Sequence, residues 1–229
     1  MQDLVESASF KVDYKDYQIA PDDILNIKVY SQSPELNEIF NNSLSKDPGS
    51  NLETIQINGY QVDSNGNISF PVLGHIKVMG LNTNEISRLI YNNLVDQGQL
   101  VNPSVDVKLI NSHFTVIGEV NKPGKYNFLN NNMDILQAIG IAGDLTINGK
   151  RDDIKVLRRM PDNNIKVSSI DITNSNFIRS ESFQIFSGDV IVINPNNSRV
   201  KNAGIIGNSG TLLSLLSFIL SSIIVISNS

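Results

Sequence analysis

The sequence predicts an α+β protein built from two domains and a C-terminal membrane helix. Its 229 residues exceed the usual size of one domain. Short runs of alternating apolar and polar residues, typical of strands, are interleaved with two helical segments, of which the first is amphipathic. No charged residue occurs in the last stretch, 203–229. We therefore expect an N-terminal arm over 1–16, domains over 17–111 and 112–200, and a helix over 203–229.

Composition excludes several classes of function. Hydrophobic residues make up 40% of the chain, which is enough for packed cores. The net charge is -5 without any basic run, and nucleic-acid binding needs clustered Lys and Arg, so we expect no nucleic-acid partner. The absence of Cys removes disulfides, Cys-based zinc sites and a thiol nucleophile. Met1 is followed by polar residues instead of a secretory apolar segment, which indicates either a cytoplasmic protein or a trimmed start.

The first domain begins with a turn and a strand over 17–30. Asp22 and Asp23 are adjacent, and successive strand residues point to opposite faces, so the two carboxylates are predicted to cap a turn and not to catalyse. Residues 31–58 are rich in Asn, Ser and Pro, which predicts a long loop.

A hairpin and a helix complete the predicted first domain. Asn65-Gly66 between alternating runs predicts a type I′ turn, since both central residues of that turn have positive φ. Asn82 followed by Glu85 predicts a capping box at a helix start. Residues 104–110 alternate again, which predicts a closing strand.

The second domain is predicted to have a β-grasp-like order of strand pair, helix and further strands. Within residues 114–128, Pro123-Gly124 favours a type II turn between two strands. Asn132 or Asp134 is the predicted N-cap of a helix over 133–141. Further strands are predicted at 154–159, 165–170 and 190–193.

No catalytic, metal or cofactor site is predicted. Residues 143–151, GDLTINGKR, lack the spacing of a phosphate-binding loop and follow a helix where such a loop follows a strand. His75 and His113 are isolated in strand-like contexts, so we expect them to be surface or half-buried residues.

The uncharged C-terminal segment has two chemically different faces if it is helical. Its core, 211–227, is 17 residues long, the short limit for a membrane span. A stripe of hydroxyls would suit a ring of helices around water, whereas a lone helix gains little from it. A buried helix or a plain tail anchor remains the alternative. The predicted pore-lining residues are Thr211, Ser214, Ser217 and Ser221, and the predicted lipid-facing residues are Leu212, Leu216, Ile219 and Ile223.

Five short motifs in order carry a resemblance to a known family. Residues 17–23, YQIAPDD, resemble Y-x-I-[GA]-P-G-D, and 65–74, NGNISFPVLG, resemble D-G-x-I-x-x-P-x-L-G. Residues 102–105 resemble N-P-x-V, 118–126 resemble G-E-V-x-x-P-G-x-Y, and 187–191 resemble P-G-D-x-I. In this order the motifs are similar to those of the outer-membrane polysaccharide export proteins of capsule and exopolysaccharide secretion. Asp22 and Asn65 depart from the family's Gly and Asp. The matching structural residues are Pro21, Asp23, Asn65, Gly66, Pro71, Gly74, Gly118, Glu119, Pro123, Gly124, Tyr126, Gly188 and Asp189.

The resemblance implies a fold, an assembly and partners. It implies a polysaccharide export signature domain, one SLBB-like β-grasp domain and a C-terminal amphipathic transmembrane helix. Copies would form a homo-oligomeric ring in the outer membrane, with periplasmic domains, polysaccharide cargo and an inner-membrane polysaccharide co-polymerase as partner. Relatives are commonly lipoproteins, which implies a lipidated Cys at or before Met1 as a further expectation. We expect a non-enzymatic export channel, with a tail-anchored carbohydrate-binding or adhesion module as the alternative.

Overall fold

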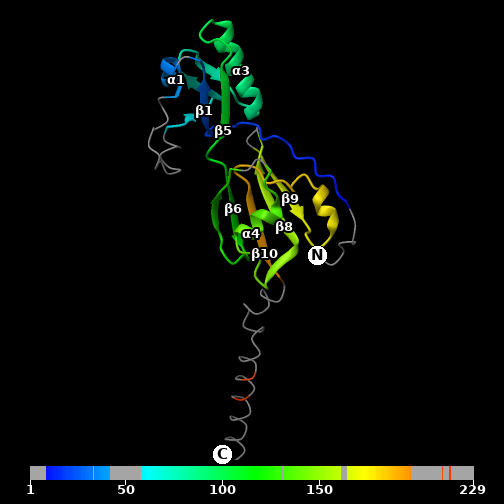
Figure 1. The fold of residues 1–229 in the computed structure, drawn as a ribbon. Helices are drawn as coiled ribbons and strands as arrows, with labels where there is room; N and C mark the ends of the chain where they lie inside the picture. The colour runs from blue at the N-terminus through cyan, green and yellow to red at the C-terminus, as the bar shows by residue number, and fades with distance from the viewer. Residues whose placement is uncertain are drawn as a thin grey trace, which may run out of the picture.

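The computed structural model describes residues 9–32, 34–41, 58–129, 132–160 and 164–196, together with Leu213 and Ser217. The described part is mixed α+β, and its two domains lie end to end (Figure 1). Two separate clusters of buried apolar side chains form the cores, one in each domain.

The first domain is a small sheet and a hairpin packed on helices. Strand β1 (Ile24–Tyr30) lies between β2 (Tyr60–Gln61) and β5 (Ser104–Leu109) and is antiparallel to both. Helix α3 (Thr83–Asp96) has the predicted capping box, with the Asn82 side chain accepting from the Glu85 main-chain N–H. Its apolar face buries Ile86, Ile90 and Leu94, which confirms this helix.

Part of the predicted loop at 31–58 is helical. Helix α1 covers Pro34–Asn41, and its Phe40 is buried with its ring stacked 6.0 Å from that of Phe70. The first residue of a helix has no helical partner for its N–H, so a proline, which has no N–H, costs no hydrogen bond there. Pro34 therefore suits the start of this helix. The prediction of a loop was therefore wrong for this segment.

The predicted hairpin has a different turn. The main-chain N–H of Gly66 donates to the Asp63 carbonyl, and only Gly66, at φ 79°, is in the left-handed region. The type I′ prediction was wrong, because that turn needs a positive φ at residue 65 as well. The paired strands β3 (Asn67–Phe70) and β4 (Gly74–Lys77) follow instead and reverse through residues 71–73.

The second domain is a five-stranded sheet in the order β7-β6-β10-β8-β9. Its central strands β6 (His113–Gly118) and β10 (Val190–Pro195) are parallel, which is the arrangement expected of a β-grasp domain. The flanking strands β7 (Gly124–Asn127), β8 (Gly149–Arg159) and β9 (Ile165–Ile170) are antiparallel to their neighbours. Helix α4 (Ile135–Ile141) and the 3₁₀ helix η1 (Ser175–Arg179) contribute to the core on one side (Figure 1).

Two local predictions for the second domain have opposite outcomes. Asp134 is the N-cap of α4, with a capping box to Gln137, as one of the two predicted options required. The type II turn at Pro123-Gly124 was wrong, since Gly124 is not among the glycines with positive φ. Gly124 is instead the first residue of β7 and pairs with Val116, so its backbone is already extended.

The predicted C-terminal helix lies almost wholly outside the described residues. Only Leu213 and Ser217 are described there; both are helical, and Leu213 is 67% exposed. Within the described ranges, no helix is both long and apolar enough to cross a bilayer.

Candidate functional site at the junction of the two domains

The N-terminal segment 9–16 lies against the second domain before the chain enters the first. Its Val12 packs on the second domain's core, and the Arg179 guanidinium lies 5.6 Å from the centre of the Phe10 ring. The Lys15 main chain donates to and accepts from the side-chain amide of buried Gln184, at 2.8 Å in each direction. We call residues 9–16 the strap. It makes the second domain a composite of two stretches far apart in the chain.

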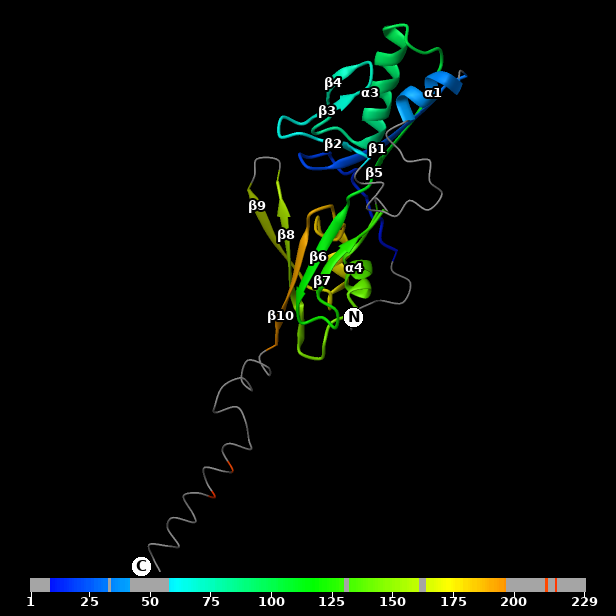
Figure 2. The same ribbon diagram turned by 90° about the vertical axis from the view of Figure 1, so that its left-hand side faces the viewer.

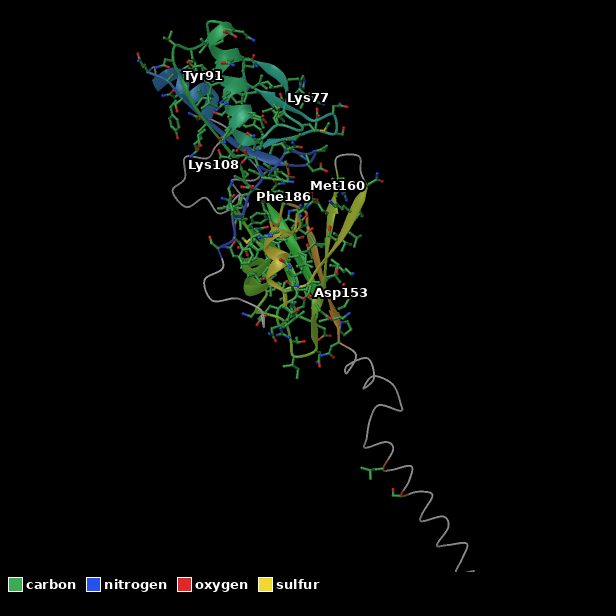
Figure 3. The ribbon with its side chains drawn as sticks, turned by 90° about the vertical axis from the view of Figure 1, so that its right-hand side faces the viewer. Lys77, Tyr91, Lys108, Asp153, Met160 and Phe186 are labelled. Atoms are coloured by element: carbon green, nitrogen blue, oxygen red, sulfur yellow. The ribbon has the colours of Figure 1, made fainter. Side chains whose placement is uncertain are left out.

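Tyr17 and Phe186 meet where the strap ends. Their ring centroids are 6.1 Å apart at an interplanar angle of 48°, and Figure 3 shows Phe186 at the boundary between the domains. The Arg158 guanidinium lies over the Phe186 ring, 4.4 Å from its centre. Aromatic pairs and cation–π contacts each contribute about 0.5–2 kcal/mol. These two contacts therefore connect the segment before β1 of the first domain to β8 of the second.

Arg158 also forms a bidentate ion pair with Asp189. Arg158 Nε donates to Asp189 Oδ1 at 2.9 Å, and Nη2 donates to Oδ2 at 2.7 Å. Asp189 also accepts from the Phe186 main-chain N–H at 2.8 Å. Burial raises the pKa of Asp189 above its usual value, and the hydrogen bonds and charge of Arg158 oppose that rise. The pair fixes the 186–189 turn that presents Phe186.

Asp23 lies near the Tyr17 hydroxyl. Its Oδ2 accepts from the Ala20 main-chain N–H at 2.9 Å, so it caps the turn as predicted, and its Oδ1 lies 3.4 Å from the Tyr17 hydroxyl. Burial raises the pKa of Asp23 to about 6. Burial also raises the pKa of Tyr17, and the charge of Asp23 raises it further. The Tyr17 hydroxyl thus stays protonated at neutral pH, and the pKa of the Asp23 carboxyl is about 6.

A second polar contact holds the segment between the domains. The Asn111 side chain accepts from the Ile24 main-chain N–H and donates to the Asp22 carbonyl, at 2.9 Å each. Asn111, which follows the last strand of the first domain, is therefore hydrogen-bonded to the residues at the start of β1.

The structure brings two of the resembling motifs together here. Tyr17 and Asp23 come from the first motif, and Gly188 and Asp189 come from the last. Asp22, in place of the family's Gly, has φ 70°, a conformation in which Gly is favoured. Phe186 and Arg158 were not singled out from the sequence, because neither lies in a motif and only the fold brings them together.

The other motif residues shape turns inside each domain. Gly118 has φ 95°, and a Cβ there would lie 2.0 Å from the Ile193 carbonyl oxygen. Glu119 accepts from the Thr146 hydroxyl at 2.8 Å. The Tyr126 hydroxyl donates to the Lys122 carbonyl across the turn that contains Pro123. Pro21 begins the turn before β1; Asn65 and Gly66 lie in the Asp63–Gly66 turn, and Pro71 and Gly74 border the β3–β4 reversal.

The described residues of the junction do not bring a nucleophile and a base together. Its carboxylates are engaged with Arg158 or with main-chain N–H groups. Among the described residues, no group of His, Asp and Glu side chains is placed to hold a metal ion. Of the predicted pore-lining residues, Ser217 is described and helical, whereas Thr211, Ser214 and Ser221 lie outside the described residues, as do Leu212, Leu216, Ile219 and Ile223.

Each of the two domains is similar to a known protein family. Residues 12–110 match the family described as "Polysaccharide biosynthesis/export protein", and residues 113–169 match the SLBB domain. The EPS I polysaccharide export outer membrane protein EpsA of Ralstonia solanacearum is 31% identical over 153 residues, which cover 62% of this chain and 39% of that protein. EpsA of Ralstonia nicotianae is 30% identical over 149 residues, covering 62% of this chain and 38% of that protein.

The matched region thus spans well under half the length of these curated relatives. The two family matches are adjacent and follow the order of the two domains in the structure. The junction residues Tyr17 and Asp23 fall within the first match, and Arg158 falls within the second. The first domain is thus similar to the polysaccharide export family and the second to the SLBB domain.

Proposed function

We propose that this chain is a non-enzymatic subunit of an oligomeric outer-membrane channel that exports a capsular or extracellular polysaccharide. The observation that carries the proposal is the junction, where Tyr17 of the first family motif contacts Phe186, and Arg158 contacts both Phe186 and Asp189 of the last motif. A fixed angle between domains lets identical copies repeat one contact around a closed ring. The curated relatives, both named as outer-membrane export proteins, support the location.

The membrane part of the proposed channel is the C-terminal segment 203–229. In a ring of such helices, Thr211, Ser214, Ser217 and Ser221 would line the lumen, since hydroxyl groups gain hydrogen bonds to water there. Leu212, Leu216, Ile219 and Ile223 would face lipid. A helix from 212 to 226 would be about 22 Å long at 1.5 Å per residue, which suits a thinner outer membrane better than a bilayer of average thickness.

The partners follow from the same proposal. Growing polysaccharide would pass through the ring, and an inner-membrane polysaccharide co-polymerase would deliver it to the periplasmic domains. A lipid anchor at the N-terminal end would add a second attachment to the membrane.

Thiol labelling tests the channel directly, because the sequence has no Cys. Single Cys substitutions at Ser214, Ser217, Leu216 and Ile219 are introduced into the full chain in membranes and treated with a water-soluble maleimide. We expect fast labelling of Ser214→Cys and Ser217→Cys and slow labelling of Leu216→Cys and Ile219→Cys, because the reactive thiolate forms where water reaches. Uniformly slow labelling at all four positions would contradict a pore and favour the plain tail anchor.

A further inference from the structure

Two loops form the end of the second domain that lies farthest from the first domain. Residues 119–123 connect β6 to β7, and residues 142–148 connect α4 to β8. Figure 2 shows both loops at this end, beside the end of β10. We call them the base loops. The described part of the second domain also ends here, at Asn196 directly after β10.

Hydrogen bonds join the base loops to each other. The Asn121 main-chain N–H donates to the Asp144 carbonyl at 3.1 Å, and the Thr146 main-chain N–H donates to the Glu119 carbonyl at 2.9 Å. The Thr146 hydroxyl also donates to Glu119 Oε2 at 2.8 Å. The second base loop is therefore held against the first on both sides of Leu145.

Ile147 lies in a tight turn of the second base loop. The Gly149 main-chain N–H donates to the Thr146 carbonyl at 3.0 Å, so Ile147 is the second residue of a four-residue turn. Its side chain is 89% exposed, more than any other large apolar side chain among the described residues. Turns favour Gly, Pro, Asn, Asp and Ser. An isoleucine at this position therefore gains neither a turn preference nor burial within the domain.

The contacts around Ile147 fix the backbone that carries it. A Cβ at Gly149 would lie 2.9 Å from the Glu119 carbonyl oxygen, so the turn is packed closely on the first base loop. The Asn196 main-chain N–H donates to the Asn148 carbonyl at 2.7 Å, and the Asn196 side-chain amide donates to the Ile147 carbonyl at 3.2 Å. The fold thus holds this isoleucine outward.

The same hydrogen bonds place Ile147 beside the residue that leads toward the uncharged segment. Residues 197–202 are all that separates Asn196 from the stretch 203–229, which contains no charged residue. At about 3.6 Å per residue, the chain from 196 to 203 spans at most about 25 Å. Arg199 and Lys201 lie within this connection, and their charges suit phosphate headgroups. The base loops are therefore tethered close to the start of the proposed membrane segment.

The charged side chains of the base loops are compatible with a lipid surface. They are Glu119, Lys122 and Asp144. Glu119 accepts from the Thr146 hydroxyl, and Asp144 Oδ1 accepts from the Leu145 main-chain N–H at 2.7 Å, so both acids are hydrogen-bonded within the loops. Lys122 is exposed. A lysine near an exposed aliphatic side chain is typical of a membrane interface, because its ammonium reaches phosphate while its carbon chain stays among apolar groups.

We propose that the base loops rest on the membrane surface and that Ile147 inserts between the lipid headgroups. Ile141, the last residue of α4, is 44% exposed at the same end and adds apolar area. This inference rests on the membrane segment of the proposed function, and it holds for a pore and for a plain tail anchor alike. Attachment through 203–229 keeps the loops at a high effective concentration near lipid, so even one inserted isoleucine adds to binding.

Tryptophan fluorescence tests the inference, because the sequence contains no Trp. Ile147→Trp and the control Ile165→Trp are made in the full chain and reconstituted into vesicles of phosphatidylethanolamine and phosphatidylglycerol, with or without bromine on the upper acyl carbons. Ile165 is the matched control, since it is an isoleucine of the same domain and 62% exposed. It pairs with Arg159 at the opposite end of β8, whose 11 residues span about 33 Å at about 3.3 Å each.

We expect brominated lipid to lower the fluorescence of Ile147→Trp at least about twofold, because an interfacial side chain lies about 5–10 Å deep, beside the bromine atoms. Iodide in the buffer should quench this variant weakly. Ile165→Trp should show the opposite pattern, with strong quenching by iodide and none by brominated lipid. Thermal melts of both variants check that these exposed substitutions leave the domains folded.

A third variant, Leu216→Trp, separates failure of this inference from failure of the proposed function. Leu216 is predicted to face lipid, so brominated lipid should quench it whether or not the base loops touch the membrane. Quenching of Leu216→Trp without quenching of Ile147→Trp would overturn the inference and leave the membrane segment standing. Quenching of neither variant contradicts both. If Ile147→Trp is shielded from iodide and from bromine together, a protein covers the loop and lipid is not its partner.

Discussion

Tyr17 and Phe186 lie with their ring centroids 6.1 Å apart, although one precedes the first strand of the first domain and the other precedes the last strand of the second. The Arg158 guanidinium lies over the Phe186 ring, and the Tyr17 hydroxyl lies beside Asp23. These contacts link the segment that enters the first domain to the segment that precedes the last strand of the second.

Removing the Arg158 charge should destabilise the protein strongly. Arg158→Met leaves the carboxylate of Asp189, which has no exposed side-chain surface, without its partner, at a cost of about 3–5 kcal/mol. Denaturant unfolding measures this loss. The adjacent exposed Arg159 is the control, and Arg159→Met should change stability by less than about 0.5 kcal/mol. Adding Asp189→Asn to Arg158→Met should recover part of the loss, and no recovery would contradict the role given to the buried charge.

The buried Asp23 should make stability fall as pH rises from about 4 to about 6. Its pKa in the folded protein is raised to about 6 from 3.8, so the fold prefers the protonated carboxyl. A shift of this size corresponds to about 3 kcal/mol at 1.36 kcal/mol per unit. Asp23→Asn should remove this part of the pH dependence, as measured by the difference between the two proteins' unfolding free energies at pH 4 and pH 7. Parallel curves for the two proteins would show that Asp23 does not titrate in this range.

Restoring the family's glycine at position 22 should stabilise the first domain. Asp22 has φ 70°, which costs an L-residue energy that glycine avoids. We expect Asp22→Gly to raise stability by about 0.5–1 kcal/mol and Asp22→Val to lower it by about 1–3 kcal/mol. The order Gly, Asp, Val in melting temperature is the result to check, and a valine variant as stable as the native protein would rule out the strain.

Two glycines of one motif should respond oppositely to alanine. At Gly118 a Cβ would lie 2.0 Å from the Ile193 carbonyl oxygen, and φ is 95°, so Gly118→Ala should cost at least about 2 kcal/mol. At Gly124 the nearest atom to a Cβ is the Tyr126 hydroxyl oxygen at 4.0 Å. Gly124→Ala should therefore be neutral within about 0.5 kcal/mol in the same thermal melts. Equal effects would contradict the backbone assigned to this segment.

Deleting residues 203–229 should separate the folded domains from the membrane. The described domains have their own buried cores, so the shortened chain should remain folded and be recovered as soluble protein. It should lose polysaccharide export in cells that depend on it. Export by the shortened chain would show that this segment is not the channel.

The sequence predicted best those elements that local residues determine. The α3 helix follows from Asn82, Glu85 and apolar residues at helical spacing, and the structure has this capping box. The α1 helix was missed amid Asn and Ser, although Pro34 followed by Leu36 and Phe40 at a spacing of four carries the signal of a helix start and its apolar face.

Turn types were harder, because neighbouring strands decide the backbone conformation. Pro123-Gly124 has the residues of a type II turn, but pairing of Gly124 with Val116 keeps that glycine extended. At Asn65-Gly66 the glycine alone takes a positive φ. The candidate site was the least predictable part: Asp23 was identified as a cap, yet its neighbours across the junction belong to distant segments without any shared pattern.

The position of β10 has a mechanical consequence. This strand leads toward the C-terminal segment, yet it lies in the middle of its sheet, bonded to β6 on one side and to β8 on the other. A pull along the chain beyond Pro195 acts along the strand, so it would load both ladders of hydrogen bonds in shear instead of opening them one by one. A force transmitted from the membrane would therefore act first on the two hydrogen-bonded ladders that flank β10. It would reach the Tyr17–Phe186 contact only after them.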